Sequence, residues 1–352
     1  AALLGLVTQR LGQGAILGAI GAGVLLGPDV LGLVERDGFL ETAGELGVTL
    51  LMFGVGLDFA WAELRRLGKR AAGTGLAQVV VTLGAAAAVA AAFGVPWPAG
   101  IAAGAMLALS STATVMAAIH ERSEDDARHA RLAFAVLLLQ DVAVVPIVVL
   151  VAALAQPSGA TLSWTSFLVA SGGAVLLAGL LWLLSRHAFP WLMGASSASR
   201  SRDLPILVSV ATCLAAAWSA HRLGVSPAIG AFVAGVLLAG SPFATRVRAD
   251  IGALRALFAT AFFTTVGMRA DLAWIGEHLG LVLGVSVALV AGKTLLASLA
   301  AAAMGWRPGV ALAAGLCLAQ VGEFAFVIAG VRGEPALLGE HLLQLIVAVS
   351  VL

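Results

Sequence analysis

Charged residues are scarce in this sequence. They occupy 11% of its 352 positions, whereas a soluble domain carries about 25%. Hydrophobic residues occupy 61%, and the mean hydropathy is +1.03. These values exclude a soluble globular domain, because a chain this apolar can hide its surface only in lipid. The net charge of +1 gives no indication of a surface for nucleic acid.

Residues that build disulfides, metal sites and catalytic sites are also few. The two cysteines, Cys213 and Cys317, lie within apolar segments, which is typical of small buried hydrophobes rather than of a disulfide or a metal pair. The six histidines lack metal-ligand spacing, and no GxGxxG loop, Walker loop or catalytic triad occurs. We therefore expect no enzymatic activity, no cofactor, no nucleic-acid partner and no metal beyond a transported cation.

Long apolar runs make up most of the chain. Because backbone polar groups cannot be left bare in lipid, these runs predict about thirteen transmembrane helices. The predicted helices span residues 1–10 (in part), 12–27, 42–58, 71–93, 99–119, 131–155, 165–189, 204–221, 225–240, 251–267, 272–303, 309–331 and 339–352. The expected fold class is an all-α integral membrane protein that forms one transmembrane domain over residues 1–352. No cleavable signal peptide is visible, and the first helix begins within an apolar run.

Basic residues gather in alternate loops. One set of loops holds fifteen of them, and the other set holds four, namely Arg36, Arg222, Arg269 and Arg332. The positive-inside rule makes the richer set cytoplasmic. We therefore expect the N-terminus outside and the C-terminus in the cytoplasm. The twentieth basic residue, Lys293, lies within a predicted helix.

Three stretches of the sequence recur 211 or 212 residues later. The pairs are QRLGQGAILGAIGAGVLLG (9–27) with HRLGVSPAIGAFVAGVLLAG (221–240), FGVGLD (53–58) with TTVGMRAD (264–271), and IAAGAMLALSSTATVMAAI (101–119) with LAAGLCLAQVGEFAFVIAG (312–330). Equivalent helices are seven apart, an odd number, so the second copy crosses the membrane upside down. Inverted repeats, here about 1–155 and 204–352 with a linker helix at 165–189, are typical of secondary transporters with a substrate site at the midplane.

One acidic side chain interrupts the apolar run AFAVLLLQDVAVVPIVVLV (133–151). In a helix that starts near Arg131, Asp141 lies about 15 Å along the axis, close to the middle of the bilayer. A charge there costs at least roughly 2.5 kcal/mol. A carboxylate can hold either a proton or a dehydrated alkali cation, so we predict that Asp141 exchanges one for the other. Its neighbour Gln140 can coordinate a cation but cannot titrate. A structural carboxylate or a permanent salt bridge remains the alternative.

Two other predicted helices carry polar breaks at matching positions of the repeat. Such breaks suit helices that unwind at the midplane and turn their ends toward an ion. The residues are Ser110, Ser111, Thr112 and Thr114 in LALSSTATV, and Gln320, Gly322 and Glu323 in LAQVGEFAF. For the hydroxyls, hydrogen bonds back to their own helix are the alternative. For Glu323 the alternative is a salt bridge that holds the unwound helix.

Lys293 lies well inside a predicted helix, in a chain that uses lysine only twice. Lysine can lose its proton when it is buried, whereas arginine effectively cannot. We predict that Lys293 pairs with Asp141 when no cation is bound. The alternatives are a purely structural lysine, or a lysine whose aliphatic chain extends so that its ammonium group reaches the membrane–water interface.

These motifs resemble one family. FAVLLLQDVAVVPIV is similar to the helix of the Kef-type potassium:proton antiporters, in the monovalent cation:proton antiporter superfamily, where a Gln-Asp pair marks the ion site. LALSSTATVM, AGVLLAGS, FFTTVGMRADL and QVGEFAFVI follow in the family's order, so the resemblance covers essentially the whole chain. It implies an ion site of Asp141 and Gln140, with the crossing-helix residues Ser110, Ser111, Thr112, Gln320 and Glu323 and the late basic residue Lys293.

The resemblance also implies a homodimer with an elevator-like core, in a bacterial inner membrane. Family members usually continue into a cytoplasmic nucleotide-binding domain, whereas this sequence stops at Leu352. Only Asp250 matches the acidic loop of glutathione-gated members, so glutathione control is not expected. We predict exchange of K+ for H+, because electrogenic sodium exchangers usually carry a second aspartate at the position of Gln140. A Na+:H+ antiporter, or a regulated cation channel, is the alternative.

Overall fold

The structure is a computed structural model that describes most of the chain. The described residues are 1–10, 15–28, 30–34, 38–58, 67–154, 179, 183, 191, 203–222, 226–241, 243–329 and 338–351. Every regular element within them is a helix, as the composition predicts, and none is a strand. The predicted linker helix 165–189 lies outside the described residues except at positions 179 and 183. Arg332 also lies outside them.

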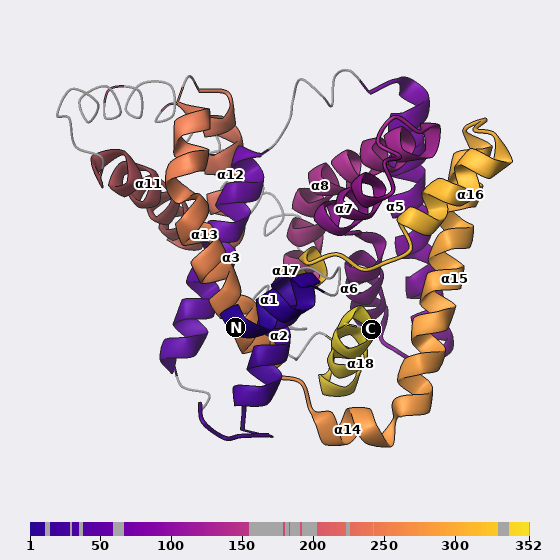
Figure 1. Cartoon of the computed structure of the whole chain (residues 1–352), viewed down its shortest axis with the longest axis horizontal. Coiled ribbons are helices and arrows are strands. Elements are labelled where there is room, and N and C mark those ends of the chain that lie inside the picture. Colours follow the sequence, from indigo (N-terminus) through magenta and orange to yellow (C-terminus); the bar gives the residue numbers. More distant parts are fainter. Residues whose placement is uncertain are drawn as a thin grey trace. The chain divides into compact units, whose positions relative to one another are not determined.

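The helices are labelled as in Figure 1. In the first half of the chain they are α1 (Ala2–Arg10), α2 (Ala15–Leu26), α3 (Gly38–Leu57), α5 (Lys69–Ala92), α6 (Trp97–Ala108), α7 (Thr112–Glu121) and α8 (Arg128–Leu154). In the second half they are α11 (Asp203–Arg222), α12 (Pro227–Ala239), α13 (Ala244–Gly267), α14 (Leu272–Glu277), α15 (Leu279–Ala303), α16 (Pro308–Cys317), α17 (Phe324–Ala329) and α18 (Glu340–Val351). Six segments of the described chain are long and apolar enough to cross a membrane, α5, α8 and α15 among them.

Apart from the helices interrupted at the predicted polar breaks, two predicted helices differ most from the structure in extent. The predicted helix 272–303 is divided at His278 into α14 and α15, and Asp271 caps α14 by accepting a hydrogen bond from the Trp274 N–H. The predicted helix 251–267 begins earlier, at Ala244. Its first turns carry Arg246 and Asp250. Two charges in this part of the sequence suggest a loop, but in the structure the two side chains pair one turn apart on the helix.

The chain forms two compact units, and each draws on both halves of the sequence. The first comprises Ala1–Glu35, Trp61–Ala155 and Val266–Leu352, and the second comprises Arg36–Ala60 and Gln156–Thr265. Each unit therefore contains segments of both predicted repeats, about 1–155 and 204–352.

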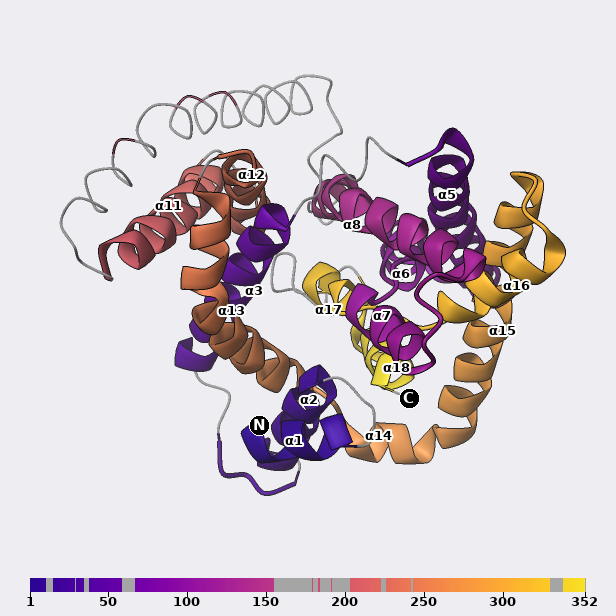
Figure 2. The same cartoon turned by 45° about the horizontal axis from the view of Figure 1, so that its top comes forward.

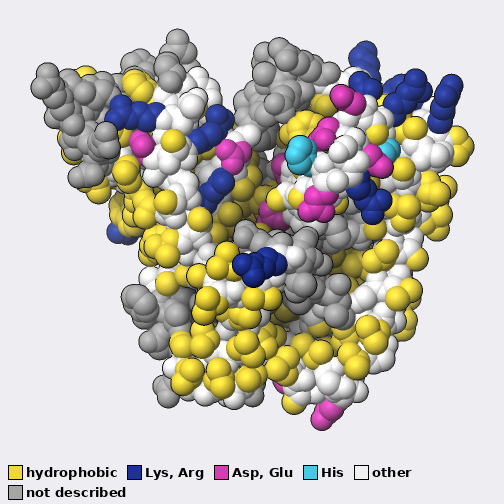
Figure 3. All heavy atoms as spheres, in the orientation of Figure 1, with side chains coloured by type: hydrophobic (Ala, Val, Ile, Leu, Met, Phe, Trp, Pro, Cys, Tyr) yellow, Lys and Arg dark blue, Asp and Glu magenta, His cyan; other side chains and the backbone are white. Residues whose placement is uncertain are grey.

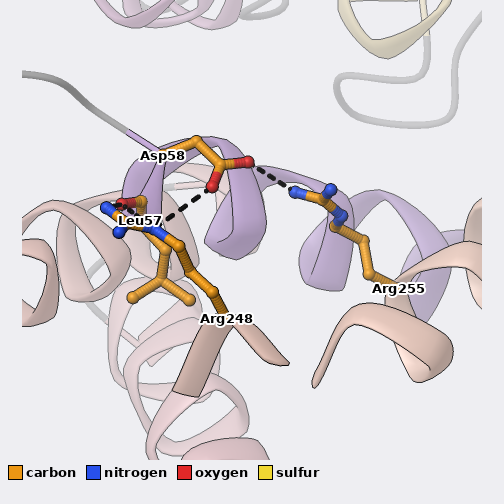
Figure 4. A network of polar contacts seen from close by, with 4 residues as sticks. All are labelled: Leu57, Asp58, Arg248 and Arg255. Carbon is orange, nitrogen blue, oxygen red and sulfur yellow. Dashed lines mark hydrogen bonds and ion pairs between the residues drawn. The ribbon is translucent and has the colours of Figure 1, made fainter. Parts of the chain in front are cut away.

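The second unit packs α3 against α12, and α12 against α11. Gly56 and Gly235 lie at the contact of α3 with α12, where a Cβ on either would meet the other helix's backbone. At the end of α3, the Asp58 carboxylate pairs with Arg248 at 3.3 Å and with Arg255 at 2.7 Å (Figure 4). The Arg248 Nε also donates to the Leu57 carbonyl at 3.0 Å. The arginines thus satisfy the negative end of α3.

The first unit holds the two interrupted helices. Its helices α6, α7 and α17 contact α8, while α5 lies against α6, α8 and α15 (Figures 1 and 2). Both α6 and α16 begin with a proline in the first turn, where its missing N–H costs nothing. Both helices then stop within twelve residues, so the two matching sequences form matching local structures.

Candidate functional site: two crossed helix breaks beside Asp141

The polar breaks predicted from the sequence are breaks in the helices. The first separates α6 from α7 at residues 109–111, and the second separates α16 from α17 at residues 318–323. The two breaks lie against each other: the Gly322 N–H donates to the Leu109 carbonyl at 3.0 Å. The Ser110 hydroxyl donates to the Leu318 carbonyl at 2.9 Å. Backbone groups freed by one break are thus satisfied by the other.

Gly322 allows this close approach. A Cβ at this position would lie 2.7 Å from the Ser110 carbonyl carbon and 2.9 Å from both the Ser110 oxygen and the Ser111 nitrogen. Those atoms are backbone, and they cannot turn aside as a flexible side chain would. The crossing therefore requires glycine for space, a reason separate from its conformational freedom.

Two glutamines anchor the first break from neighbouring helices. The Gln140 Oε1 on α8 accepts from the Ser110 N–H at 2.8 Å, and its Nε2 donates to the Gln78 Oε1 on α5 at 2.7 Å. The Gln78 Nε2 in turn donates to the Ala108 carbonyl at 3.1 Å and to the Thr82 hydroxyl at 3.2 Å. Both amides are fully buried, so these bonds replace those that water would make.

Lys293 on α15 joins the two breaks. Its ammonium group donates to the Leu109 carbonyl at 3.0 Å and to the Gln320 carbonyl at 2.7 Å. The Gln320 Nε2 donates to the Ser111 carbonyl at 3.1 Å. The Lys293 side chain is 1% exposed, so its charge is compensated by the negative ends of carbonyl dipoles. The predicted pairing of Lys293 with Asp141 remains a prediction.

Asp141 lies on α8 beside the start of α7. The Thr112 hydroxyl is 3.2 Å from one carboxylate oxygen of Asp141 and 3.5 Å from the other. Thr112 is the first residue of α7, and Ser111 caps that helix by accepting from the Thr114 N–H at 3.3 Å. The start of α7, whose first N–H groups have no partner within the helix, therefore lies beside the carboxylate. Asp141 is half-buried.

The structure joins most of the site residues that the sequence predicts. Two groups of hydrogen bonds hold these residues: one links Ser110 with Gln140, and the other links Lys293, Gln320 and Ser111. The two groups meet where Ser110 and Ser111 are neighbours in the chain, and Thr112, which contacts Asp141, is the next residue. The Glu323 side chain is half-buried just before α17 and makes no hydrogen bond or ion pair with another described residue. Sequence reasoning missed Gln78, although an amide isolated in the apolar stretch LAQVVV could have indicated a buried polar contact.

We expect the variant Gln140→Leu to lose most transport activity while Asp141 stays intact. The change leaves the Ser110 N–H and the Gln78 Oε1 buried without partners, at about 1–3 kcal/mol for each group. Thermal unfolding and transport rate, measured together, check this.

The matched control is Gln344→Leu. Gln344 is also buried and bridges two backbone groups, accepting from the Asp271 N–H and donating to the Arg269 carbonyl. The control variant should unfold at a lower temperature than the parent, but its transport rate should depend on cation concentration as the parent's does. If Gln140→Leu transports at the parental rate, the glutamine anchor is dispensable for the site.

Membrane-length helices, two crossed helix breaks and an acid beside a helix start define the class of secondary ion transporters. The chain belongs to the family of transmembrane sodium/hydrogen exchangers, whose sequence profile matches residues 1–352. It is therefore an integral membrane protein of the monovalent cation:proton antiporter family.

Relatives of the chain are named for potassium efflux. K(+) efflux antiporter 4 of Arabidopsis thaliana is 33% identical over 321 residues, covering 90% of this chain and 54% of the relative. K(+) efflux antiporter 5 of the same plant is 31% identical over 335 residues, covering 93% and 58%. The chain thus spans about half the length of these curated relatives. The sodium proton antiporter MjNhaP1 of Methanocaldococcus jannaschii shares the fold, with a TM-score of 0.70 and 15% identity over 99% of this chain and 90% of that one.

Proposed function

We propose that the protein exchanges K+ for H+ across the membrane, with Asp141 holding the proton and the cation in turn. The observation that carries the proposal is the position of the Asp141 carboxylate. It lies against the Thr112 hydroxyl at the start of α7 and adjoins the crossed breaks. A carboxylate beside a hydroxyl oxygen can hold either a proton or a monovalent cation, which is what exchange requires.

The surrounding residues have different roles in this proposal. Thr112 contacts the carboxylate and supplies a hydroxyl oxygen that can also face a cation. Ser110 and Gln140 hold the first break in place, because their polar groups are engaged with backbone and with Gln78. With one titratable group, one proton is exchanged for one monovalent cation, and the cycle moves no net charge.

The choice of potassium rests on two observations. The relatives reported above are named for K(+) efflux, and position 140 carries a neutral glutamine instead of a second acid. The solved antiporter with the same fold is named for sodium, so sodium is the competing cation. A cation channel would need no titratable acid beside the crossing.

Alternating access in this proposal uses the predicted inverted repeats. The matching stretches FGVGLD and TTVGMRAD each contain a Val-Gly pair, and the packing of the two glycines supports the repeats. Gly56 packs on α12, and Gly267 packs on the Ile20 backbone of α2. The sequences of α2 and α12 are themselves one of the matching pairs. We extend the proposal to a homodimer in a bacterial inner membrane with the N-terminus outside, following the arginine distribution.

The test uses the purified chain in liposomes that carry an imposed pH gradient. We expect K+ to dissipate the gradient in a saturable way, with a smaller response to Na+ and Li+, and without dependence on an applied membrane potential. A larger response to Na+ would overturn the potassium assignment. Cation uptake that persists without any proton movement would identify a channel and overturn the antiport mechanism.

A further inference from the structure

A cavity lined by arginines opens on the first unit, away from Asp141. Its volume is about 480 Å³, and its walls include Arg70, Arg128, Arg131, Trp306 and Arg307. This volume falls within the range of small-ligand sites, about 300–1,000 Å³. The remaining lining residues are a glycine and a valine, so none of them is acidic. Figure 3 shows Lys and Arg side chains gathered over the ends of α5 and α16, above a flank of hydrophobic side chains.

All four arginines lie at helix starts. Arg70 is in the first turn of α5, Arg128 and Arg131 are in the first turn of α8, and Arg307 is the residue that caps α16. Each helix start already carries a partial positive charge of about half an elementary charge, so carboxylates are the favoured residues there. None of these three first turns contains one. Positive charge is thus concentrated around the cavity without a compensating acid in its lining.

One wall of the cavity is held rigidly. The Arg70 Nε donates to the Met304 carbonyl at 2.9 Å, and its guanidinium lies 5.1 Å from the centre of the Trp306 ring. The Trp306 indole in turn donates to the Thr74 hydroxyl at 3.1 Å. These contacts orient the guanidinium before any ligand arrives, which lowers the cost of binding.

The other three arginines are available. Arg128, Arg131 and Arg307 are exposed, and none forms a hydrogen bond or an ion pair through its side chain within the part of the chain that the structure describes. In the loop before α8, Glu124 is 3.0 Å from His129, and Asp125 is 3.3 Å from His120. These acids therefore already have partners other than the arginines.

We propose that the four-arginine pocket binds a phosphate group, carried either by an anionic lipid headgroup or by a soluble phosphate ester. Guanidinium groups fit phosphate oxygens with paired hydrogen bonds, and helix starts add N–H donors and positive potential. The pocket lies at the ends of the membrane-length helices α5 and α8, and Trp306 suits the headgroup level. Its arginines belong to the face that the charge distribution predicts to be cytoplasmic.

Phosphate binding there would act on the ion site through the helices. Arg131 lies ten residues before Asp141 on α8, about 15 Å along the axis. Arg70 lies eight residues before Gln78 on α5, and α16 leads from Arg307 to the second break. A bound phosphate would hold the starts of these three helices together. The binding itself does not depend on antiport and can be tested without transport.

The experiment compares three forms of the full chain, each purified and stripped of lipid in detergent. The first is the parent. The second is the triple variant Arg128→Gln, Arg131→Gln and Arg307→Gln, which leaves the structural Arg70 in place. The third is a control triple variant with the same loss of charge outside the cavity, Arg10→Gln, Arg122→Gln and Arg222→Gln. Thermal unfolding and native mass spectrometry are measured with phosphatidylglycerol, phosphatidylcholine and glycerol 3-phosphate, at equal ionic strength.

We expect phosphatidylglycerol to stabilise the parent and the control, and the pocket variant to bind it roughly tenfold more weakly or worse, because charge-assisted hydrogen bonds are lost. Stabilisation by glycerol 3-phosphate alone would assign the phosphate to a soluble ligand. Without ligand, the pocket variant should unfold at the parental temperature or above, since like charges have been removed. Equal binding by the pocket variant and the parent, or no phosphate effect beyond that of chloride, would overturn the proposal.

Discussion

The variant Asp141→Asn is expected to reduce cation-driven proton movement to the level of protein-free liposomes. Asparagine can still accept the hydrogen bond from the Thr112 hydroxyl, so the local packing and the dimension of the side chain are kept. It can neither release a proton nor offset the charge of a dehydrated cation. Fluorescence from a pH-sensitive dye inside the liposomes, recorded on addition of K+, gives the measurement.

A second acid provides the matched control. Asp271 also uses its carboxylate to accept a hydrogen bond at a helix start, from the Trp274 N–H at 2.9 Å. Asp271→Asn should therefore keep exchange near the parental rate. Asp141→Glu retains the acid but moves it by one methylene, so we expect weak exchange with an altered cation dependence. If Asp141→Asn still collapses the pH gradient, Asp141 has a structural role and the proposed mechanism is wrong.

The variant Gly322→Ala is expected to disable transport through the backbone alone. Its new methyl group would lie 2.7 Å from the Ser110 carbonyl carbon, so the two helix breaks must move apart. Overpacking of this kind costs typically about 1–3 kcal/mol. The movement would also stretch the hydrogen bond from Gly322 to Leu109 and displace the carbonyls that Lys293 holds. Thermal unfolding and the K+-dependent transport rate are measured together.

Gly284→Ala on α15 controls for the loss of a glycine. A Cβ at Gly284 meets nothing within 4 Å, and alanine favours a helix by roughly 1 kcal/mol over glycine. This variant should transport normally and unfold at the parental temperature or slightly above. Parental transport by Gly322→Ala would mean that the crossing has more room than the structure indicates.

Local sequence patterns were sufficient for the parts of the fold that depend on local chemistry. Apolar runs predicted α8, α11 and α12 to within a few residues, and the polar breaks near Ser110 and Gln320 are breaks in the helices. The pattern failed at His278 and at Ala244. The first is a break of one residue inside an apolar segment, and the second is a helix start that carries charged residues, among them Arg246 and Asp250. Mean hydropathy registers neither feature.

By itself the sequence determined that this chain is a helical membrane protein with an acid, Asp141, in the middle of an apolar helix. Lipid excludes unpaired backbone and tolerates few charges, so composition and spacing carry that information. Only the tertiary structure decided that Gln78 and Gln140 anchor one break, that Lys293 binds carbonyls of both breaks, and that arginines from three helix starts surround one cavity. These hydrogen bonds join residues from 27 to 184 positions apart. Hydrogen bonds at such separations depend on how helices pack, which no local pattern records.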